Sequence, residues 1–581
     1  MPDGRTARHI PVSVKNSRTF PFAVAIRRLL REGYSLSRLR ADITAGITVG
    51  IVALPLSMAF AIVSGVKPQH GLYTAIIAGG LTAVTGGSRN AVSGPTAAFV
   101  VLLAPISAKY GLGGLALASA MAGVILVIMG LFRLGRLVSF VPHPVTTGFT
   151  AGIAVVIATL QIRDFLGLRY TATGEHYWDK VYDTATALAS VHWPDLLVGC
   201  ITLLLLLLWP KITRRVPASV IAIGAGAALA YFLNLELGAQ GVATVEGRFG
   251  VIPQLPPLPV LPWAETGADG QPLGLSLDLF RALIGPAFAM AALGAIVSLM
   301  TAVVADGVTS TKHDPDAELV GQGLGNIVAP FFGGIASSGA IARTITGIRS
   351  GGTSPVAAVS HAVFVLGAVV LLAPFLGYLP MASMAALLLL VAWNMADVRH
   401  FLHMLRVAPR SDLAVLLLCL LLTVVFDMVV SVSVGIVLAA LLFMRRMAEI
   451  TGARMVTGAG NQLREPLPPG VILYEIAGPL FFGAAEKAMS QILNAPVAVK
   501  TAVLDMSAVP VMDVTGLVAL ESVLQKLQAR GACVIIGGLQ AQPRRLLDRA
   551  GLVEVPSVLR FCVSLEQALE EARRQRIDKV V

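Results

Sequence analysis

The residues SGPTAA, at positions 93–98, interrupt an otherwise apolar stretch with a Gly-Pro pair. Proline has no N–H to donate and is favoured in the first turn of a helix, so we expect a helix to start at Pro95. This helix would end near Lys109 after about 21 Å, which is too short to cross a hydrocarbon core of about 30 Å. Its N-terminus would lie within the bilayer, where free N–H groups and about half a positive charge favour an anion. The residues predicted to line this site are Gly94, Pro95, Thr96 and Ala97.

A second interrupted segment lies in the other half of the chain, at GGIASSGAIARTITGIRSGG (333–352). It is rich in Gly and Ser and then allows a short helix starting near Ser338. It also contains Arg343, a cation at membrane depth, where charge is costly and usually functional. Two short, interrupted segments at corresponding places of two halves indicate a central binding site. The alternative is that both are kinks for tight helix packing. The residues predicted from this segment are Ser338, Gly339, Ala340, Ala342 and Arg343.

The composition identifies the elements that must position these residues. The chain of 581 residues is 56% hydrophobic and 13% charged, whereas about a quarter of the residues of a soluble protein are charged. We therefore predict a polytopic α-helical membrane protein. Its net charge of +11 is assigned to cytoplasmic loops rather than to nucleic-acid binding. The fourteen predicted membrane segments are 43–64, 68–86, 95–108, 113–132, 145–162, 195–209, 216–234, 281–304, 318–333, 339–348, 354–373, 381–395, 411–427 and 429–444.

The distribution of basic residues predicts the orientation. If the basic N-terminal arm is cytoplasmic, most of the loops assigned to the cytoplasm are also basic, including PKITRR (210–215) and the stretch 397–412. The longest outside loop, about 235–280, is net acidic. This pattern places both termini in the cytoplasm. The predicted domains are an N-terminal arm (1–41), a transmembrane domain (42–447), a linker (448–469) and a soluble domain (470–581).

The soluble domain alternates strand and helix patterns, which predicts a small α/β fold. The four cysteines are scattered and suggest neither a disulfide framework nor a zinc site. The histidines show no metal-ligand spacing, and no nucleophile–base arrangement indicates an enzyme. We therefore expect no metal and no cofactor.

Several motifs together resemble one family of membrane proteins. They are VALPLSMAFA (52–61), PQHGLY (68–73), SGPTAA (93–98), STKHDPDAELVGQGLGN (310–326) and LDMSAVPVMDVTGL (504–517). They resemble the SulP anion transporters. Three further motifs are most similar to the branch containing the bacterial C4-dicarboxylate transporter: LVGQGLGNIVAPFFGGI (319–335), VAWNM (391–395) and SVGIVLAALLFMRRM (433–447). The resemblance implies two inverted repeats of seven segments, arranged as a core and a gate domain. It also implies an elevator mechanism, a homodimer and a C-terminal STAS domain.

The resemblance also assigns residues. From the first segment, Leu56, Ser57 and Phe60 would line the anion pocket. Many bacterial symporters of the family carry a carboxylate at the position of Val297, where it serves sodium or proton coupling. Here that position is apolar, although Ser298 and Thr301 remain as oxygen donors. The apolar residue argues against coupling to H⁺ or Na⁺, and it favours uncoupled transport or anion exchange.

In the STAS-like domain, MDVTG (512–516) matches a loop in which related regulators carry a phosphorylatable residue, here Thr515. The alternative is that Asp513 or Thr515 caps the following helix. We expect this loop to bind a cytosolic partner protein.

The main hypothesis is a secondary transporter of small anions, with succinate or fumarate as substrate. The alternatives are a carrier or uncoupled pathway for bicarbonate, sulfate or chloride, and a membrane-tethered signalling scaffold.

Overall fold

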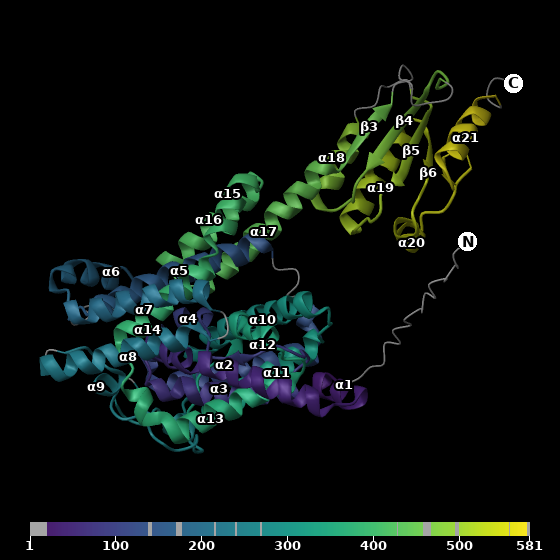
Figure 1. Ribbon diagram of the computed structural model, residues 1–581. Helices are drawn as coiled ribbons and strands as arrows, with labels where there is room; N and C mark the ends of the chain where they lie inside the picture. The colour runs from purple at the N-terminus through teal and green to yellow at the C-terminus, as the bar shows by residue number, and fades with distance from the viewer. Residues whose placement is uncertain are drawn as a thin grey trace, which may run out of the picture. The chain divides into compact units, whose positions relative to one another are not determined.

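The computed structural model describes residues 20–136, 142–169, 177–213, 216–238, 241–267, 270–426, 428–456, 466–493, 499–556 and 558–577. They form two compact units that divide between Ile436 and Val437. The first unit is helical and the second is an α/β domain (Figure 1). Residues 1–19 of the predicted N-terminal arm and 457–465 of the predicted linker lie outside the described part of the chain.

The helical unit confirms the prediction of a polytopic α-helical protein, because each of the fourteen predicted segments overlaps a helix. The segments 95–108 and 113–132 share one helix, α4, which is broken at Gly111 (φ 69°, ψ −169°). By length and composition, nine helices of the described residues could cross a membrane. The helices are α1 (Val24–Glu32), α2 (Leu36–Val63), α3 (Pro68–Thr85), α4 (Ala97–Leu131), α5 (His143–Leu166), α6 (Tyr177–Thr186), α7 (Trp193–Ile212), α8 (Ala218–Leu237), α9 (Val245–Phe249), α10 (Leu277–Thr309), α11 (Pro315–Val328), α12 (Ile341–Arg349), α13 (Pro355–Gly377), α14 (Met381–Ala396), α15 (Val398–Val407), α16 (Arg410–Val425) and α17 (Met428–Ile450), and the two short strands are β1 (Ser93–Gly94) and β2 (Ser338–Gly339).

The helices of this unit pack in two sets. The first set interleaves α2, α3 and α4 from the first half of the chain with α10, α11, α12 and α13 from the second half. The second set contains α5, α7 and α8 together with α14 and α16. Figure 1 shows α2, α3, α11 and α13 side by side, although they come from opposite halves of the sequence. These two sets correspond to the predicted core and gate domains.

Glycines allow the core helices to cross closely. A Cβ added to Gly123 on α4 would lie 2.6 Å from the carbonyl oxygen of Gly323 on α11, and one added to Gly323 would lie 2.6 Å from that of Gly123. The Cβ of any larger residue at Gly321 would lie 2.6 Å from the Cα of Gly86. The motif GQGLGN (321–326), which resembles a dinucleotide fingerprint, is therefore a helix-packing motif, as its position in an apolar helix predicts.

The second unit is built on a five-stranded sheet in the order β3-β4-β5-β6-β7. Strand β3 is antiparallel to β4, and the other neighbours are parallel. Buried residues of α18 and α19 form one core with the sheet, and α21 packs on another part of it. The elements are β3 (Gly452–Val456), β4 (Val471–Ala477), α18 (Phe482–Leu493), β5 (Thr501–Ala508), α19 (Val514–Ala529), β6 (Cys533–Gly537), α20 (Ala541–Arg549), β7 (Leu559–Cys562) and α21 (Leu565–Ile577). The sequence predicts the segment 448–469 to be a linker, but the structure places strand β3 within it. The strand forms because its backbone groups hydrogen-bond with those of β4.

Candidate functional site

The two interrupted segments meet in the centre of the core helices. Strands β1 and β2 pair antiparallel, with Ser93 opposite Gly339 and Gly94 opposite Ser338. The N–H of Ala340 continues the pairing by donating to the carbonyl oxygen of Val92 (2.8 Å). The structure thus brings together the two segments that the sequence predicts to share one site.

The pairing shifts both helix starts relative to the prediction. Helix α4 begins at Ala97 rather than Pro95, and α12 begins at Ile341 rather than near Ser338. In both places the N-cap residue, Thr96 or Ala340, is extended and lies one or two residues after a strand of the β1–β2 pair. The predicted break near the end of the first half-helix is confirmed by the kink at Gly111.

Both helices start without a side-chain cap. The side chains of the N-cap residues Thr96 and Ala340 accept no hydrogen bond from the first turn. The hydroxyl of Thr96 instead pairs with that of Ser338, with 2.7 Å between the two oxygens. The partial positive charge at each N-terminus is therefore not offset by a capping oxygen, and N–H groups of both helices are directed to one region. Ile341 and Ala342 are exposed there, whereas the preceding residues are buried.

Arg343 is the charged residue of this region, and only 2% of it is exposed. Its Nη2 donates to the carbonyl oxygen of Pro95 (2.9 Å) and to Oγ of Ser57 on α2 (3.3 Å). These acceptors are uncharged, and Nη1 has no hydrogen-bond partner among the described residues. A buried guanidinium is costly unless it is paired, so Nη1 is left with donor capacity that an anion would satisfy.

Gly94 packs against the guanidinium of Arg343. A Cβ at this position would lie 2.5 Å from Nη1 of the guanidinium, well inside van der Waals contact. The sequence predicts that Gly94 lines an anion site; in the structure its missing side chain makes room for the guanidinium. The predicted residues of α2 lie in the core: Ser57 is fully buried and contacts Arg343, and Leu56 and Phe60 are buried nearby in the same helix.

A network of buried amides positions the strands, and the sequence reasoning did not find it. Oε1 of Gln322 accepts from Oγ of Ser93 (3.0 Å) and Oγ of Ser298 (3.3 Å), and its Nε2 donates to Ser337. Asn326, one turn later on α11, exchanges hydrogen bonds with the backbone of Ser337. The signal in the sequence is the spacing of Gln322 and Asn326, two amides four residues apart in an otherwise apolar helix.

The predicted coupling position lies against β2. Oγ of Ser298 accepts from the N–H of Gly339 (3.0 Å), and the hydroxyl of Thr301 donates to the carbonyl oxygen of Val297 in its own helix (2.7 Å). Gly339 packs closely on both, because an added Cβ would lie 2.9 Å from the Cα of Ser298 and from the Cβ of Thr301. The two hydroxyls that the sequence offers as cation ligands thus have structural partners.

His361 on α13 is a second feature that the sequence reasoning missed. Its side chain is fully buried, and neither ring nitrogen has a hydrogen-bond partner among the described residues. The backbone of His361 lies where α13 packs on α2, since a Cβ at Gly46 would be 2.8 Å from its nitrogen.

In the second unit, Asp513 is the N-cap of α19 and accepts from the N–H of Gly516 (2.8 Å). This confirms the structural alternative for Asp513. Thr515 lies in the first turn of the same helix and is exposed, between the exposed side chains of Val514 and Val518.

These observations define a class of protein: a polytopic membrane protein in which two uncapped helix N-termini and a buried guanidinium meet, as in a transporter of anions. The chain belongs to the Sulfate permease family, whose profile matches residues 39–419, and the STAS domain profile matches residues 464–572. It is an anion transporter with a C-terminal STAS domain and not an enzyme, which confirms the family that the motifs indicate.

Two curated relatives illustrate the similarity. The chain is 40% identical to the putative sulfate transporter YvdB of Bacillus subtilis, over 90% of this chain and 95% of the relative. It is 30% identical to the bicarbonate transporter BicA of Picosynechococcus, over 92% of this chain and 94% of the relative.

Two solved structures support the fold. The murine Slc26a9 anion transporter in the inward-facing state superposes with a TM-score of 0.83 at 18% identity, covering 95% of this chain and 94% of that one. The transmembrane domain of a cyanobacterial BicA gives a TM-score of 0.58 at 26% identity, covering 70% of this chain and 98% of that one.

Proposed function

We propose that the protein carries a small inorganic oxyanion, sulfate or bicarbonate, which binds between the N-termini of α4 and α12 and beside Arg343. The observation that carries this proposal is the buried guanidinium whose Nη1 has no partner among the described residues. An oxyanion would accept hydrogen bonds from Nη1 and from backbone N–H groups at the same time, and its charge would offset the cost of burying Arg343. Sulfate and bicarbonate are also the anions in the names of the two relatives.

The charges of the site favour a small anion. Arg343 is the sole buried Lys or Arg among the described residues. A C4-dicarboxylate has a carboxylate at each end, so its second carboxylate would lie without a cationic partner. Succinate and fumarate, which the motif resemblance suggests, therefore remain the second candidates.

The test is uptake of labelled sulfate, bicarbonate and succinate into proteoliposomes that contain the full chain. We expect saturable uptake of an inorganic oxyanion that succinate inhibits weakly. Saturable succinate uptake with no sulfate or bicarbonate flux would establish the second candidate. No flux of any anion from folded protein would favour the signalling scaffold.

A matched pair of variants tests the site. Arg343→Gln removes the buried cation and should abolish uptake, whereas Arg349→Gln removes an exposed cation at the other end of α12 and should leave uptake unchanged. Thermal unfolding and size-exclusion profiles of both variants report whether they fold. Normal uptake by folded Arg343→Gln would contradict the proposed site.

We further propose that the first set of helices carries the anion against the second set, as an elevator, within a homodimer in the bacterial inner membrane. Both termini would be cytoplasmic, with residues 42–447 as the transport domain and 470–581 as the STAS domain.

The exposed first turn of α19, with Thr515 between two exposed valines, is the proposed contact for a cytosolic partner. The apolar residue at Val297 supports transport without Na⁺ or H⁺ coupling.

A further inference from the structure

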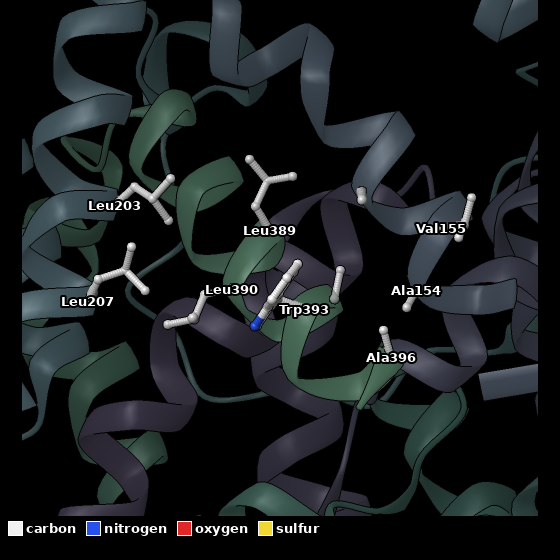
Figure 2. Close-up of a pocket in the computed structure, with 10 residues that line it drawn as sticks. Ala154, Val155, Leu203, Leu207, Leu389, Leu390, Trp393 and Ala396 are labelled. Atoms are coloured by element: carbon white, nitrogen blue, oxygen red, sulfur yellow. The ribbon is translucent and has the colours of Figure 1, made fainter. Parts of the chain in front are cut away.

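An apolar groove of about 620 Å³ lies among α5, α7 and α14 (Figure 2). Its lining consists of Ala, Val, Leu and Trp side chains only. Small residues such as Ala154 and Ala158 on α5 give the groove its depth, and leucines of α7 and α14 form its sides. Leu207 and Trp393 are 50% and 66% exposed, so the groove opens at the surface of the helical unit.

The groove extends toward the end of the helices that the basic loops assign to the cytoplasm. Helix α14 contributes Trp393 and, at its last residue, Ala396. Helix α7 contributes Leu203 and Leu207 from its C-terminal half. Since α7 and α14 both run toward the cytoplasm in the proposed orientation, the groove lies in the cytoplasmic leaflet. A tryptophan at its mouth is typical of the membrane–water interface.

Basic residues lie at this end of the groove. On α7, Lys211 follows Leu203 and Leu207 at intervals of four residues, so it lies on the same face of the helix, and it is exposed. Directly after α14, helix α15 carries the exposed cations Arg399 and Arg406.

The character of α15 also suits a membrane surface. This helix has no buried residue, and it exposes Leu402 (46%) and Val407 (68%) as well as its cations. A short basic helix with exposed apolar side chains lies in the plane of the interface and attracts anionic lipids.

We propose that this groove binds an acidic phospholipid of the cytoplasmic leaflet. One acyl chain lies in the groove between α5, α7 and α14, and the headgroup phosphate lies near Lys211 and the cations of α15. The lining offers an aqueous ligand no polar group apart from the indole N–H of Trp393, whereas an acyl chain matches it.

Charge argues against a second copy of this chain as the occupant. In a two-fold symmetric contact the same patch of both protomers is apposed. The Lys211 and Arg399 side chains of the two copies would then lie at the same depth, with like charges opposed, which disfavours the contact. An anionic headgroup neutralises the same cluster.

The experiment measures lipid bound to the full-length protein by native mass spectrometry, after purification from nanodiscs of phosphatidylglycerol and phosphatidylcholine. We expect the protein to retain phosphatidylglycerol preferentially. Lys211→Gln should lower that preference about fivefold, the usual contribution of one cation near a charged membrane. Its control, Lys109→Gln, removes an exposed lysine of α4 at the opposite membrane face and should leave the preference unchanged.

A second pair of variants tests the groove itself. Ala158→Phe fills it and should reduce retention of both lipids, whereas Leu204→Phe, at an exposed position of α7 outside the lining, should not. Equal retention of the two lipids by the native protein would overturn the proposal. It would also be overturned if Ala158→Phe changed the number of chains per particle while bound lipid stayed constant, since the groove would then be an interface between copies.

Discussion

Arg343 and Gly94, which come from opposite halves of the chain, pack against each other at the candidate site. The guanidinium donates to the carbonyl of Pro95 on one side and to Ser57 on the other, which fixes its plane and directs Nη1 away from both acceptors. Gly94 lies beside Nη1, where any side chain would collide. The position of the Arg343 guanidinium therefore depends on Gly94, which has no side chain of its own.

Replacing Gly94 by alanine should abolish or strongly reduce transport. The added methyl group would lie 2.5 Å from Nη1 and would force the guanidinium out of place. The matched control is Gly224→Ala on α8, where an added Cβ meets nothing within 4 Å and no change is expected. The measurement is the initial rate of anion uptake into proteoliposomes at equal amounts of folded protein. Native rates in Gly94→Ala would mean that the guanidinium position is not critical.

His361 allows a prediction about stability at the same scale. A buried polar group without a hydrogen bond costs about 1–3 kcal/mol, and both nitrogens of this ring lack partners among the described residues. The near-isosteric change His361→Leu should therefore raise the thermal unfolding temperature, whereas His403→Leu on the exposed face of α15 should not change it. The measurement is thermal unfolding in detergent. A lower unfolding temperature in His361→Leu would indicate that the imidazole has a partner in solution.

At the scale of elements, the site depends on two strands of two residues each. Strands this short are not stable by themselves, and β1 and β2 persist because side chains of α10 and α11 hold them. Ser298 accepts from the backbone of β2, and Gln322 accepts from Ser93 of β1. The helix N-termini are thus directed to one place by hydrogen bonds from neighbouring helices.

Removing the hydroxyl of Ser298 should lower the stability of the protein more than removing the hydroxyl of Thr301. Ser298→Ala leaves the buried N–H of Gly339 without an acceptor, and we expect a loss of about 1–3 kcal/mol. Thr301→Val removes a hydrogen bond to the carbonyl of its own helix, which already has a helical partner, and should be nearly neutral. The two changes are compared by the midpoint of thermal or denaturant unfolding. Equal losses would show that β2 does not depend on Ser298.

The sequence was sufficient for those elements that follow from local chemistry. Proline, glycine and apolar runs predicted the fourteen segments, the interrupted pair and the break before Gly111. Local patterns could not predict the β1–β2 pairing, because it joins residues from opposite halves of the chain. For the same reason local patterns do not reveal the role of Gln322, and they place the starts of α4 and α12 two or three residues early.

At the scale of the whole molecule, the core interleaves helices of both halves, so that one buried cation serves two half-helices. Moving such a site across a bilayer moves charge with it, unless a bound anion compensates. In the proposed elevator mechanism, the bound oxyanion would reduce the charge of the core helices, and a coupling cation would raise it again. Val297 is apolar, so this position offers no acid to hold a cation.

If the anion moves without a coupling cation, as proposed, the membrane potential should drive its transport. Sulfate moving without a cation carries negative charge, and each elementary charge gains about 2.3 kcal/mol per 100 mV of membrane potential. We expect an inside-positive potential, set with K⁺ and valinomycin, to accelerate sulfate uptake into proteoliposomes. An inward Na⁺ or H⁺ gradient at zero potential should have no effect. Val297→Asp restores a carboxylate and should make uptake sensitive to one of these gradients. Native uptake that requires a Na⁺ or H⁺ gradient would contradict uncoupled transport, and uptake that requires an internal anion at zero potential would identify an exchanger.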